Sequence, residues 1–286
     1  MGQFRATAMN TQILFDGGAF LEGPRWRDGR LWFSDMHSRQ ILTVDLAGNS
    51  EVIGTVPNRP SGLGWLPDGR LLAVSMQDRR LLRMEPTGLV EHADMSGFAE
   101  HECNDMVVDA LGRAYVGHFG FDHFNHRQFR PASILLVEPN GDVRVVADDL
   151  KFPNGTVIAD GGHTLIVSES YGRRLTAFDI NSDGSLGRRR TWAALDMAPD
   201  GICLDAKGCI WVASPTERAV VRVSEGGAIS RRIDVGQKAI ACMLGGSDRM
   251  WLFILTSETT QPEKAVATRS ARIETARVEV PGAGLP

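Results

Sequence analysis

The amino-acid sequence predicts an all-β fold, a six-bladed β-propeller with four-stranded blades. One strand-like segment recurs six times, at residues 29–35, 69–75, 112–118, 163–169, 208–214 and 249–255. Successive copies start about 40 to 50 residues apart, a spacing typical of propeller blades. A mostly polar residue stands at a nearly constant offset before each copy, and no helical periodicity extends over ten or more residues. Together these observations favour a propeller.

Each repeat divides into four short apolar stretches separated by turn residues. In the second repeat the stretches are residues 62–65, 71–76, 80–85 and 89–93, and Asp68-Gly69 between the first two is a strong hairpin signal. A β-sandwich would also contain many short strands. It would not keep a polar residue at one offset from a strand through the successive copies, so the propeller is preferred.

The two ends of the chain indicate how the ring closes. Residues 11–16 form a strand-like run before the first repeat, and the sixth repeat is one strand short. We therefore expect the N-terminal strand to complete the last blade, with residues 12–15 pairing with residues 273–278, in one domain over residues 1–286. Residues 256–269 are expected to form a surface loop. Residues 119–131 form a second long loop, rich in aromatic residues and histidines.

Composition limits the partners. Hydrophobic residues make up 43% of the chain and the net charge is −4, which gives no reason to expect nucleic acid or an anionic membrane surface. A small molecule is the expected partner, and the oligomeric state is left open. The N-terminus lacks the apolar stretch of a signal peptide, so a cytoplasmic location is expected. The four cysteines form no Cys-x-x-Cys pair and are expected to be buried free thiols.

The residues at the constant offset suggest a metal site. In chain order they are Glu22, Ser61, Asn104, Asn154, Asp200 and Ala241. Equivalent starts of the inner strands form a ring around the channel of a propeller, so four oxygen-bearing side chains should face one another: Glu22, Asn104, Asn154 and Asp200. Such donors suit a hard divalent cation, Ca²⁺ best. Asn and Asp also cap turns, but Glu is a poor turn residue, and this favours a site.

Four short segments resemble the signatures of a known family. They are Leu-Glu-Gly-Pro-Arg-Trp at 21–26, Asn104-Asp105, Phe-Pro-Asn-Gly at 152–155 and Pro-Asp-Gly at 199–201. They are similar to segments of the regucalcin/gluconolactonase (SMP-30/gluconolactonase/LRE-like) family of six-bladed propellers, and the resemblance covers nearly the whole chain. It implies that Glu22, Asn154 and Asp200 bind one divalent cation, with Asn104 at the metal or the substrate. It also implies that Asp200 moves protons. Besides Ca²⁺, the cations Mg²⁺, Mn²⁺, Zn²⁺ and Fe²⁺ would suit the site.

The sequence departs from the sugar-lactonase pattern at the expected substrate pocket. Regucalcin-like members carry Arg two residues before the Asn, and this chain has Glu102 there. Together with the Phe-rich loop, this favours a lactone less polar than gluconolactone. The candidate substrate-binding residues are Ser61, Glu102, Asn104, His118, Phe119, Phe121 and Asp122.

The predicted function is metal-dependent hydrolysis of a lactone, with Asp200 as the catalytic base. Two alternatives stay open at this point. One is hydrolysis of an organophosphate triester at the same metal, because related propellers act on such substrates. The other is a propeller that binds a ligand without catalysis.

Overall fold

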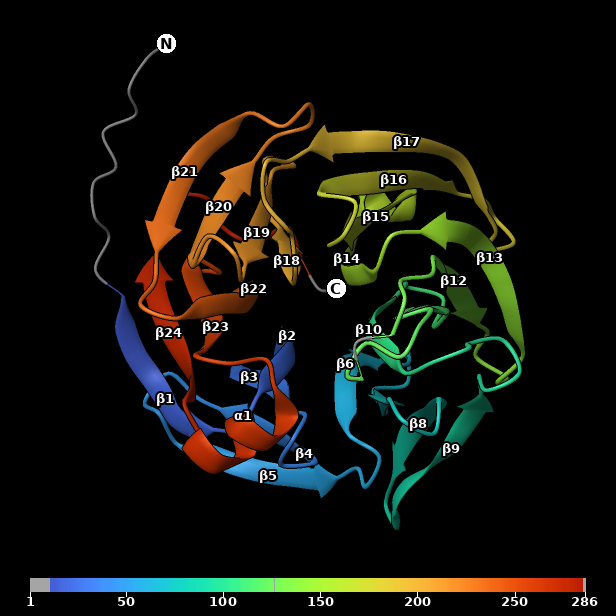
Figure 1. Cartoon of the computed structure of the whole chain (residues 1–286), viewed down its shortest axis with the longest axis horizontal. Coiled ribbons are helices and arrows are strands. Elements are labelled where there is room, and N and C mark those ends of the chain that lie inside the picture. Colours follow the sequence, from blue (N-terminus) through green and yellow to red (C-terminus); the bar gives the residue numbers. More distant parts are fainter. Residues whose placement is uncertain (1–10, 126, 285–286) are drawn as a thin grey trace.

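A computed structural model describes residues 11–125 and 127–284, which form six four-stranded antiparallel sheets arranged in a ring (Figure 1). From the channel outward, the first blade contains β2 (Leu21–Arg27), β3 (Arg30–Asp35), β4 (Gln40–Val44) and β5 (Ser50–Thr55). The second contains β6 (Pro60–Trp65), β7 (Leu71–Ser75), β8 (Arg80–Glu85) and β9 (Gly88–Asp94). The third contains β10 (Cys103–Val108), β11 (Ala114–His118), β12 (Ala132–Val137) and β13 (Val143–Leu150). The predicted propeller is thereby confirmed.

The remaining blades follow the same plan. The fourth contains β14 (Pro153–Ala159), β15 (Thr164–Glu169), β16 (Arg174–Ile180) and β17 (Leu186–Ala194), with the short 3-10 helix η1 (Asp160–Gly162) after β14. The fifth contains β18 (Ile202–Leu204), β19 (Ile210–Ser214), β20 (Ala219–Val223) and β21 (Ile229–Asp234). The sixth contains β22 (Lys238–Gly245), β23 (Trp251–Ser257), β24 (Ala271–Arg277) and β1 (Gln12–Gly18).

The N-terminal strand closes the ring, as predicted. In the antiparallel register of β1 and β24, Gln12 lies opposite Thr275 and Phe15 lies opposite Ile273. The outer strand of the last blade therefore comes from the other end of the chain (Figure 1). Because β1 pairs with β24, the edge of β24 is covered and the two ends of the chain are held in one blade.

One expectation was wrong in part. Residues 256–269 were expected to form a loop, but they contain the helix α1 (Pro262–Thr268). Proline suits the first turn of a helix, and the buried Ala265 belongs to the same apolar cluster as Phe20 and Met36. A helix of seven residues is too short to show a clear periodicity in the sequence.

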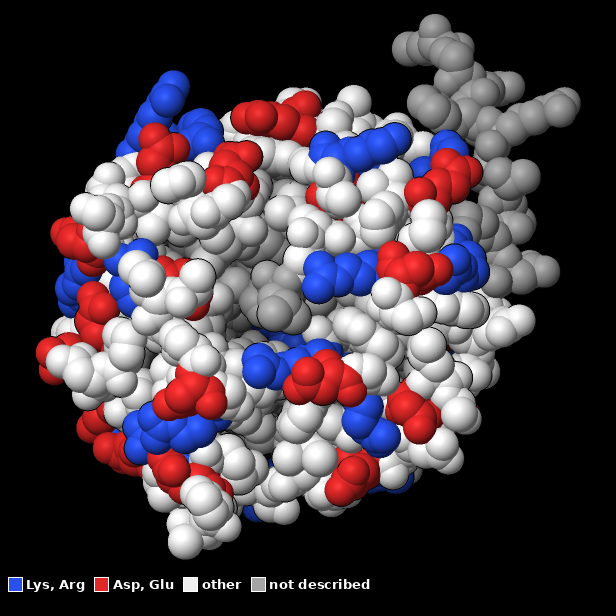
Figure 2. Space-filling model, turned by 180° about the vertical axis from the view of Figure 1, so that it is seen from behind, with Lys and Arg blue, Asp and Glu red and all other residues white. Residues whose placement is uncertain are grey.

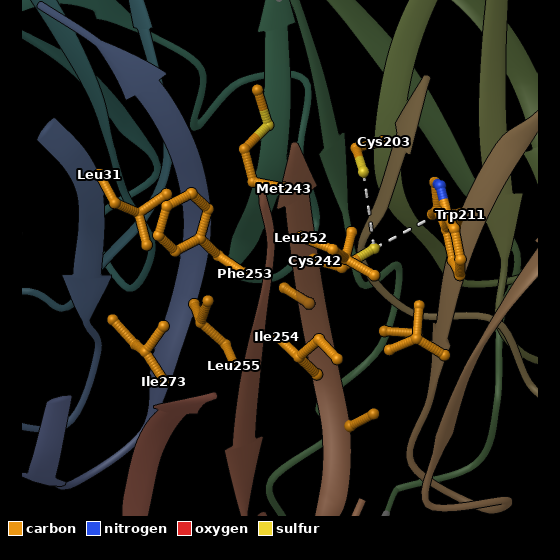
Figure 3. Close-up of a cluster of buried hydrophobic side chains, with 14 of the residues drawn as sticks. Leu31, Cys203, Trp211, Cys242, Met243, Leu252, Phe253, Ile254, Leu255 and Ile273 are labelled. Atoms are coloured by element: carbon orange, nitrogen blue, oxygen red, sulfur yellow. Dashed lines mark hydrogen bonds between the residues drawn. The ribbon is translucent and has the colours of Figure 1, made fainter. Parts of the chain in front are cut away.

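Apolar contacts between blades form the core. The cluster in Figure 3 joins the fifth, sixth and first blades and includes Leu31, Trp211, Phe253 and Ile273. Burial of these side chains is the main force that holds the blades together. All four cysteines are free, and the Sγ atoms of Cys203 and Cys242 lie 3.8 Å apart inside this cluster. The prediction of free thiols is confirmed, although Cys209 is only partly buried.

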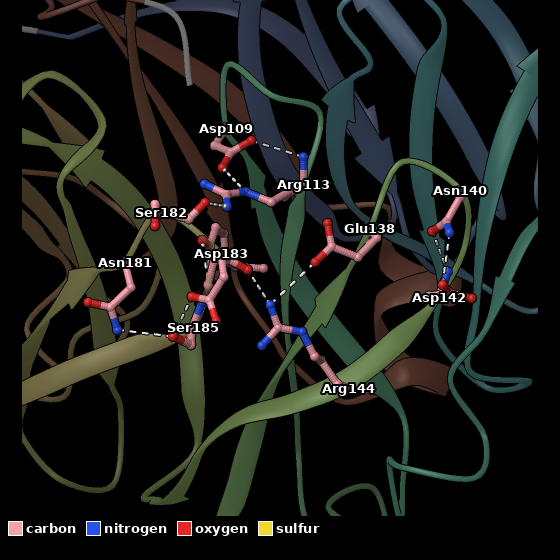
Figure 4. A network of polar contacts seen from close by, with 12 residues as sticks. Asp109, Arg113, Glu138, Asn140, Asp142, Arg144, Asn181, Ser182, Asp183 and Ser185 are labelled. Atoms are coloured by element: carbon pink, nitrogen blue, oxygen red, sulfur yellow. Dashed lines mark hydrogen bonds and ion pairs between the residues drawn. The ribbon is translucent and has the colours of Figure 1, made fainter.

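Polar contacts hold neighbouring blades together at their turns. Arg113 donates to Asp109 at 2.7 Å in its own blade and to the carbonyl of Ser182 in the next blade at 2.9 Å (Figure 4). The Tyr115 hydroxyl donates to the carbonyl of Gly184 in the same turn at 3.1 Å. These bonds fix the fourth blade against the third without using any residue of the channel.

The surface is mixed in charge. On the face shown in Figure 2, Lys and Arg side chains are interspersed with Asp and Glu rather than gathered into a patch of one sign. In the described part of the chain, neither α1 nor any other helix has the length and apolar character needed to span a membrane.

Candidate metal and substrate site

The predicted oxygen donors occupy equivalent places at one end of the channel. Glu22, Ser61, Asn104 and Asn154 are each the second residue of an inner strand, and Asp200 lies two residues before β18. Neighbouring inner strands contact one another around the ring. We call these five residues the donor ring. The structure therefore places the predicted metal ligands at one level of the channel wall.

A glycine follows the donor in four of the blades. They are Gly23, Gly62, Gly155 and Gly201, and a Cβ at any of them would lie 2.4 to 2.6 Å from an atom of the next inner strand. Only glycine allows the inner strands to approach so closely at this level. In four inner strands, β2, β6, β10 and β14, the register with the second strand also shifts across this position. Such irregularities redirect side chains, here at the donor ring.

The two carboxylates of the donor ring form no ion pair with any Lys, Arg or His in the part of the chain that the structure describes. Burial raises the pKa of Glu22 well above its ordinary value, and the nearby Asp200 and Asp105 carboxylates raise it further. Burial and the charge of Asp105 raise the pKa of Asp200 to about 8, which the amide of Asn154 only partly offsets. Like charges held together out of water favour the protonated forms. A divalent cation among them would reverse that preference.

Asp105 is a site residue that the sequence analysis did not single out. In the third blade it takes the place of the glycine that follows the donor elsewhere. It is buried and paired with the equally buried Arg25, with 3.0 Å between Oδ1 and Nη2. Arg25 also donates to the carbonyls of Pro24 and Met106. The exception to the donor-glycine pattern was the signal in the sequence that could have identified Asp105.

The donor chemistry fits a cation. Two buried oxygens, Oδ1 of Asn154 and Oδ1 of Asp200, have no hydrogen-bond partner. Buried polar atoms are normally satisfied, so these two oxygens, together with the neighbouring Glu22 carboxylate, form a set that a cation would satisfy. Within residues 11–125 and 127–284, no three or more His, Cys, Asp or Glu side chains gather as a metal-binding group. The set here instead combines two carboxylates with amide oxygens, which suits a hard cation such as Ca²⁺.

Ser61 and Asn104 form the polar remainder of the donor ring. The Ser61 hydroxyl donates to Oδ1 of Asn104 at 3.3 Å, and Nδ2 of Asn104 makes only a long contact of 3.5 Å with the Pro153 carbonyl. Both side chains are buried. Ser61 therefore fixes the amide so that its NH₂ group is the side available for a substrate oxygen.

Aromatic side chains stack at the same end of the channel. Phe119 stacks on Phe152 with 4.8 Å between ring centroids, and Phe152 stacks on Tyr171 at 4.9 Å. Phe121 packs against the same rings. The rings of Phe119 and Phe121, both candidate substrate contacts, are buried in this stack, while Tyr171 is half exposed. Phe152 and Tyr171 belong to the apolar wall although the sequence analysis did not propose them as contacts.

The other candidate substrate residues lie in or beside the long loop. The two ring nitrogens of His118 contact the backbone N–H groups of Gly120 and Ser133, each at 3.1 Å, and burial lowers its pKa to about 4. These contacts give His118 a role in holding the loop. Asp122 accepts hydrogen bonds from Asn125. Glu102 is partly exposed directly before β10.

These features define a six-bladed propeller with a buried ring of oxygen-bearing side chains at one end of its channel. The chain belongs to the SMP-30/Gluconolactonase/LRE-like family, whose sequence profile matches residues 20–258. It is 25% identical to a pentonolactonase of Haloferax volcanii over 82% of this chain and 81% of that protein. It is 23% identical to regucalcin of Danio rerio over 86% of this chain and 85% of that protein.

Solved structures share the fold. A calcium-binding regucalcin from Agrobacterium tumefaciens superposes with a TM-score of 0.82, at 22% identity over 98% of this chain and 97% of that chain. A gluconolactonase from Xanthomonas campestris superposes with a TM-score of 0.75, at 23% identity over 94% of this chain and 90% of that chain. These structures confirm the fold, and the match to the family profile confirms the family expected from the sequence.

Proposed function

We propose that this protein is a lactonase, which hydrolyses a cyclic ester at the donor ring and releases a hydroxy acid. The observation that carries the proposal is the pair of buried carboxylates, Glu22 and Asp200, that have no cationic partner and raised pKa values. Family membership supports it, because relatives of this chain include a pentonolactonase and gluconolactonases.

A divalent cation fits the donor ring, with Ca²⁺ as the first choice. Glu22, Asn154 and Asp200 would hold it, and the amide of Asn104 lies at the same level. When bound, the cation would supply a Lewis acid for the lactone carbonyl. Two features of this chain support a cation here, namely the unsatisfied oxygens of Asn154 and Asp200 and the repulsion between the neighbouring acids.

The residues of the chain supply the remaining steps. Asp200 lies in the donor ring beside the expected position of the attacking water, and its ionised carboxylate can accept a proton from that water. Asn104 can donate its NH₂ group to an oxygen of the lactone, with Ser61 fixing the orientation of the amide. The proton held by Asp200 can then pass to the alkoxide that leaves when the ring opens.

The preferred lactone is less polar than gluconolactone. Glu102 replaces the arginine of sugar lactonases, and a carboxylate there repels an anionic substrate or the carboxylate of an aldonic product. The stack of Phe119, Phe152 and Tyr171 offers an apolar wall. An alkyl or aryl substituent on the lactone fits this mouth better than a row of hydroxyl groups.

An activity screen of metal-stripped and reconstituted protein tests the proposal. Aldono-, alkyl- and aryl-lactones and a paraoxon-type triester should be compared by kcat/KM with Ca²⁺, Mg²⁺, Mn²⁺ and Zn²⁺. We expect metal-dependent opening of alkyl or aryl lactones, and we expect Glu102→Arg to shift preference toward gluconolactone. Hydrolysis of the triester alone, or equal activity with and without metal, would contradict the proposal.

A further inference from the structure

A second layer of side chains lies next to the donor ring. In four blades it consists of the residue immediately before the inner strand, two positions before the donor: Phe20, Arg59, Glu102 and Phe152. We call this layer the upper ring. The ring of Phe124 lies 5.2 Å from Cζ of Arg59 and 5.8 Å from the ring of Phe119, which stacks on Phe152, so members of the upper ring from different blades meet at the aromatic stack. Its charged members, one basic and one acidic, stand on adjacent blades.

The backbone before β6 directs Arg59 in the same way that the backbone before β14 directs Phe152. Both residues have left-handed backbone angles, with φ of 67° and 65°, and both precede a proline. Each carbonyl accepts a backbone hydrogen bond, from Met76 at 2.9 Å and from Ser170 at 3.0 Å. Bulky residues rarely adopt this conformation, so it indicates a position held by its surroundings. Phe152 is thereby placed in the aromatic stack at the channel mouth, and the same geometry directs Arg59 toward that mouth.

The guanidinium of Arg59 packs on an aromatic ring, but its N–H groups donate no hydrogen bond to a described residue. Its Cζ lies 5.2 Å from the ring centroid of Phe124, a cation–π contact. It makes no hydrogen bond or ion pair with any residue in the described ranges, although the side chain is only partly exposed. Burial lowers its pKa, and the nearby carboxylate of Glu102 raises it. The N–H donors are therefore oriented by the contact with Phe124 and are not engaged by a described residue, which leaves them able to bind an acceptor on a substrate.

We propose that Arg59 is a specificity-determining residue that donates hydrogen bonds to an acceptor oxygen on the apolar substituent of the lactone. This inference rests on the proposed lactonase activity and specifies its substrate class. Glu102 balances the charge of Arg59, so the upper ring favours a neutral molecule over an anion. The substrate class is a neutral lactone whose alkyl or aryl substituent carries an ether, keto or methoxy oxygen.

A matched pair of substrates tests this inference. An aryl lactone and its methoxy derivative should be compared in the wild type and in Arg59→Met, with kcat and KM determined separately. We expect the wild type to favour the methoxy compound. In Arg59→Met that preference should be lost, because KM for the methoxy compound rises about 10- to 100-fold while kcat changes little. Arg39→Met is the control, because Arg39 is exposed and lies close enough to influence Arg59 electrostatically. It should retain the preference.

A charge exchange sharpens the test. Arg59→Glu should lose activity on the methoxy compound, and Arg59→Glu combined with Glu102→Arg should recover part of it, because the two positions are equivalent on adjacent blades. Equal kinetics of Arg59→Met and wild type on both lactones would overturn the inference. If the wild type opens neither lactone, the proposed function fails separately. Binding of the two lactones to wild type and Arg59→Met, measured by calorimetry, then decides the role of Arg59, and equal affinities would overturn it.

Discussion

Two buried glutamates, Glu169 at the end of β15 and Glu22 at the start of β2, have opposite surroundings. Glu169 is 0% exposed and accepts hydrogen bonds from Arg174 at 2.8 Å and from the backbone of Lys151 at 2.7 Å. Burial alone would raise its pKa, but hydrogen bonds from Arg174, Thr176 and Lys151 outweigh burial and lower it. The negative charge of Glu169 is therefore compensated by hydrogen bonds and an ion pair within the protein.

Glu22 is 6% exposed and receives no such support. Its one hydrogen bond comes from the backbone of Gly23 at 3.4 Å, and the nearest charges that raise its pKa are Asp200 and Asp105. Arg25 is close but is committed to Asp105. Buried acids elsewhere in this fold, such as Glu169, are paired with an arginine, whereas Glu22 in the donor ring forms no ion pair with a described residue. The proposed divalent cation would supply the positive charge that is absent here.

The largest expected effect follows from removing one charge of the donor ring. Glu22→Gln or Asp200→Asn should abolish tight binding of a divalent cation and lower kcat/KM about 1000-fold, as is typical when a group that stabilises developing charge is lost. Calorimetry and initial rates measure the two effects. Glu51→Gln, an exposed change in β5, is the matched control. Unchanged cation affinity in both donor-ring variants would remove the metal site.

The opposite change tests the other side of the comparison. Glu169→Ala leaves Arg174 without its buried partner and should lower the free energy of unfolding by about 3 kcal/mol. The affinity for the cation should stay the same, because Glu169 is not in the donor ring. Denaturant unfolding and calorimetry on the same preparation measure both. A loss of metal affinity without a loss of stability would contradict the distinction between the two acids.

The stability of the metal-free protein should depend on pH because the unpaired acids of the donor ring bind protons more tightly in the folded state. The folded state holds the proton of Asp200 up to about pH 8, while the unfolded chain loses it near the ordinary value of 3.8. The folded state then binds more protons than the unfolded state, so this group lowers stability as the pH rises between those values. Asp200→Asn should flatten that decline in thermal unfolding with a chelator present. If the stability of Asp200→Asn declined with pH at the same slope as that of the wild type, groups other than Asp200 would cause the decline.

The smallest expected effect concerns the orientation of Asn104. Ser61→Ala removes the hydroxyl that donates to the Asn104 amide and should lower kcat/KM about 3- to 10-fold, the usual consequence of losing one neutral hydrogen bond. Cation affinity should change little. If Ser61→Ala abolished cation binding instead, Ser61 would have to be counted among the ligands.

Sequence periodicity was sufficient to predict the fold because five of the six blades repeat a polar residue at nearly the same distance before the second strand, together with similar turn residues. It also placed Glu22, Asn154 and Asp200 at one level, since equivalent positions of a ring must face one another. The partner of Asp105 could not be predicted this way, because Arg25 reaches it from another blade. The left-handed backbone conformation of Arg59 could not be predicted from the sequence either, because the residue before a proline is normally extended.

Proton release during cation binding tests the central claim most directly. Metal-stripped protein should be titrated with Ca²⁺ at pH 7 by calorimetry in buffers of different ionisation enthalpy, alongside Asp200→Asn. If the donor ring consists of acids that stay protonated until a cation arrives, about one to two protons should leave per cation bound at pH 7, and fewer should leave at pH 9. The variant should release fewer protons and bind weakly. Tight Ca²⁺ binding with no dependence on the buffer, unchanged in Asp200→Asn, would contradict the account.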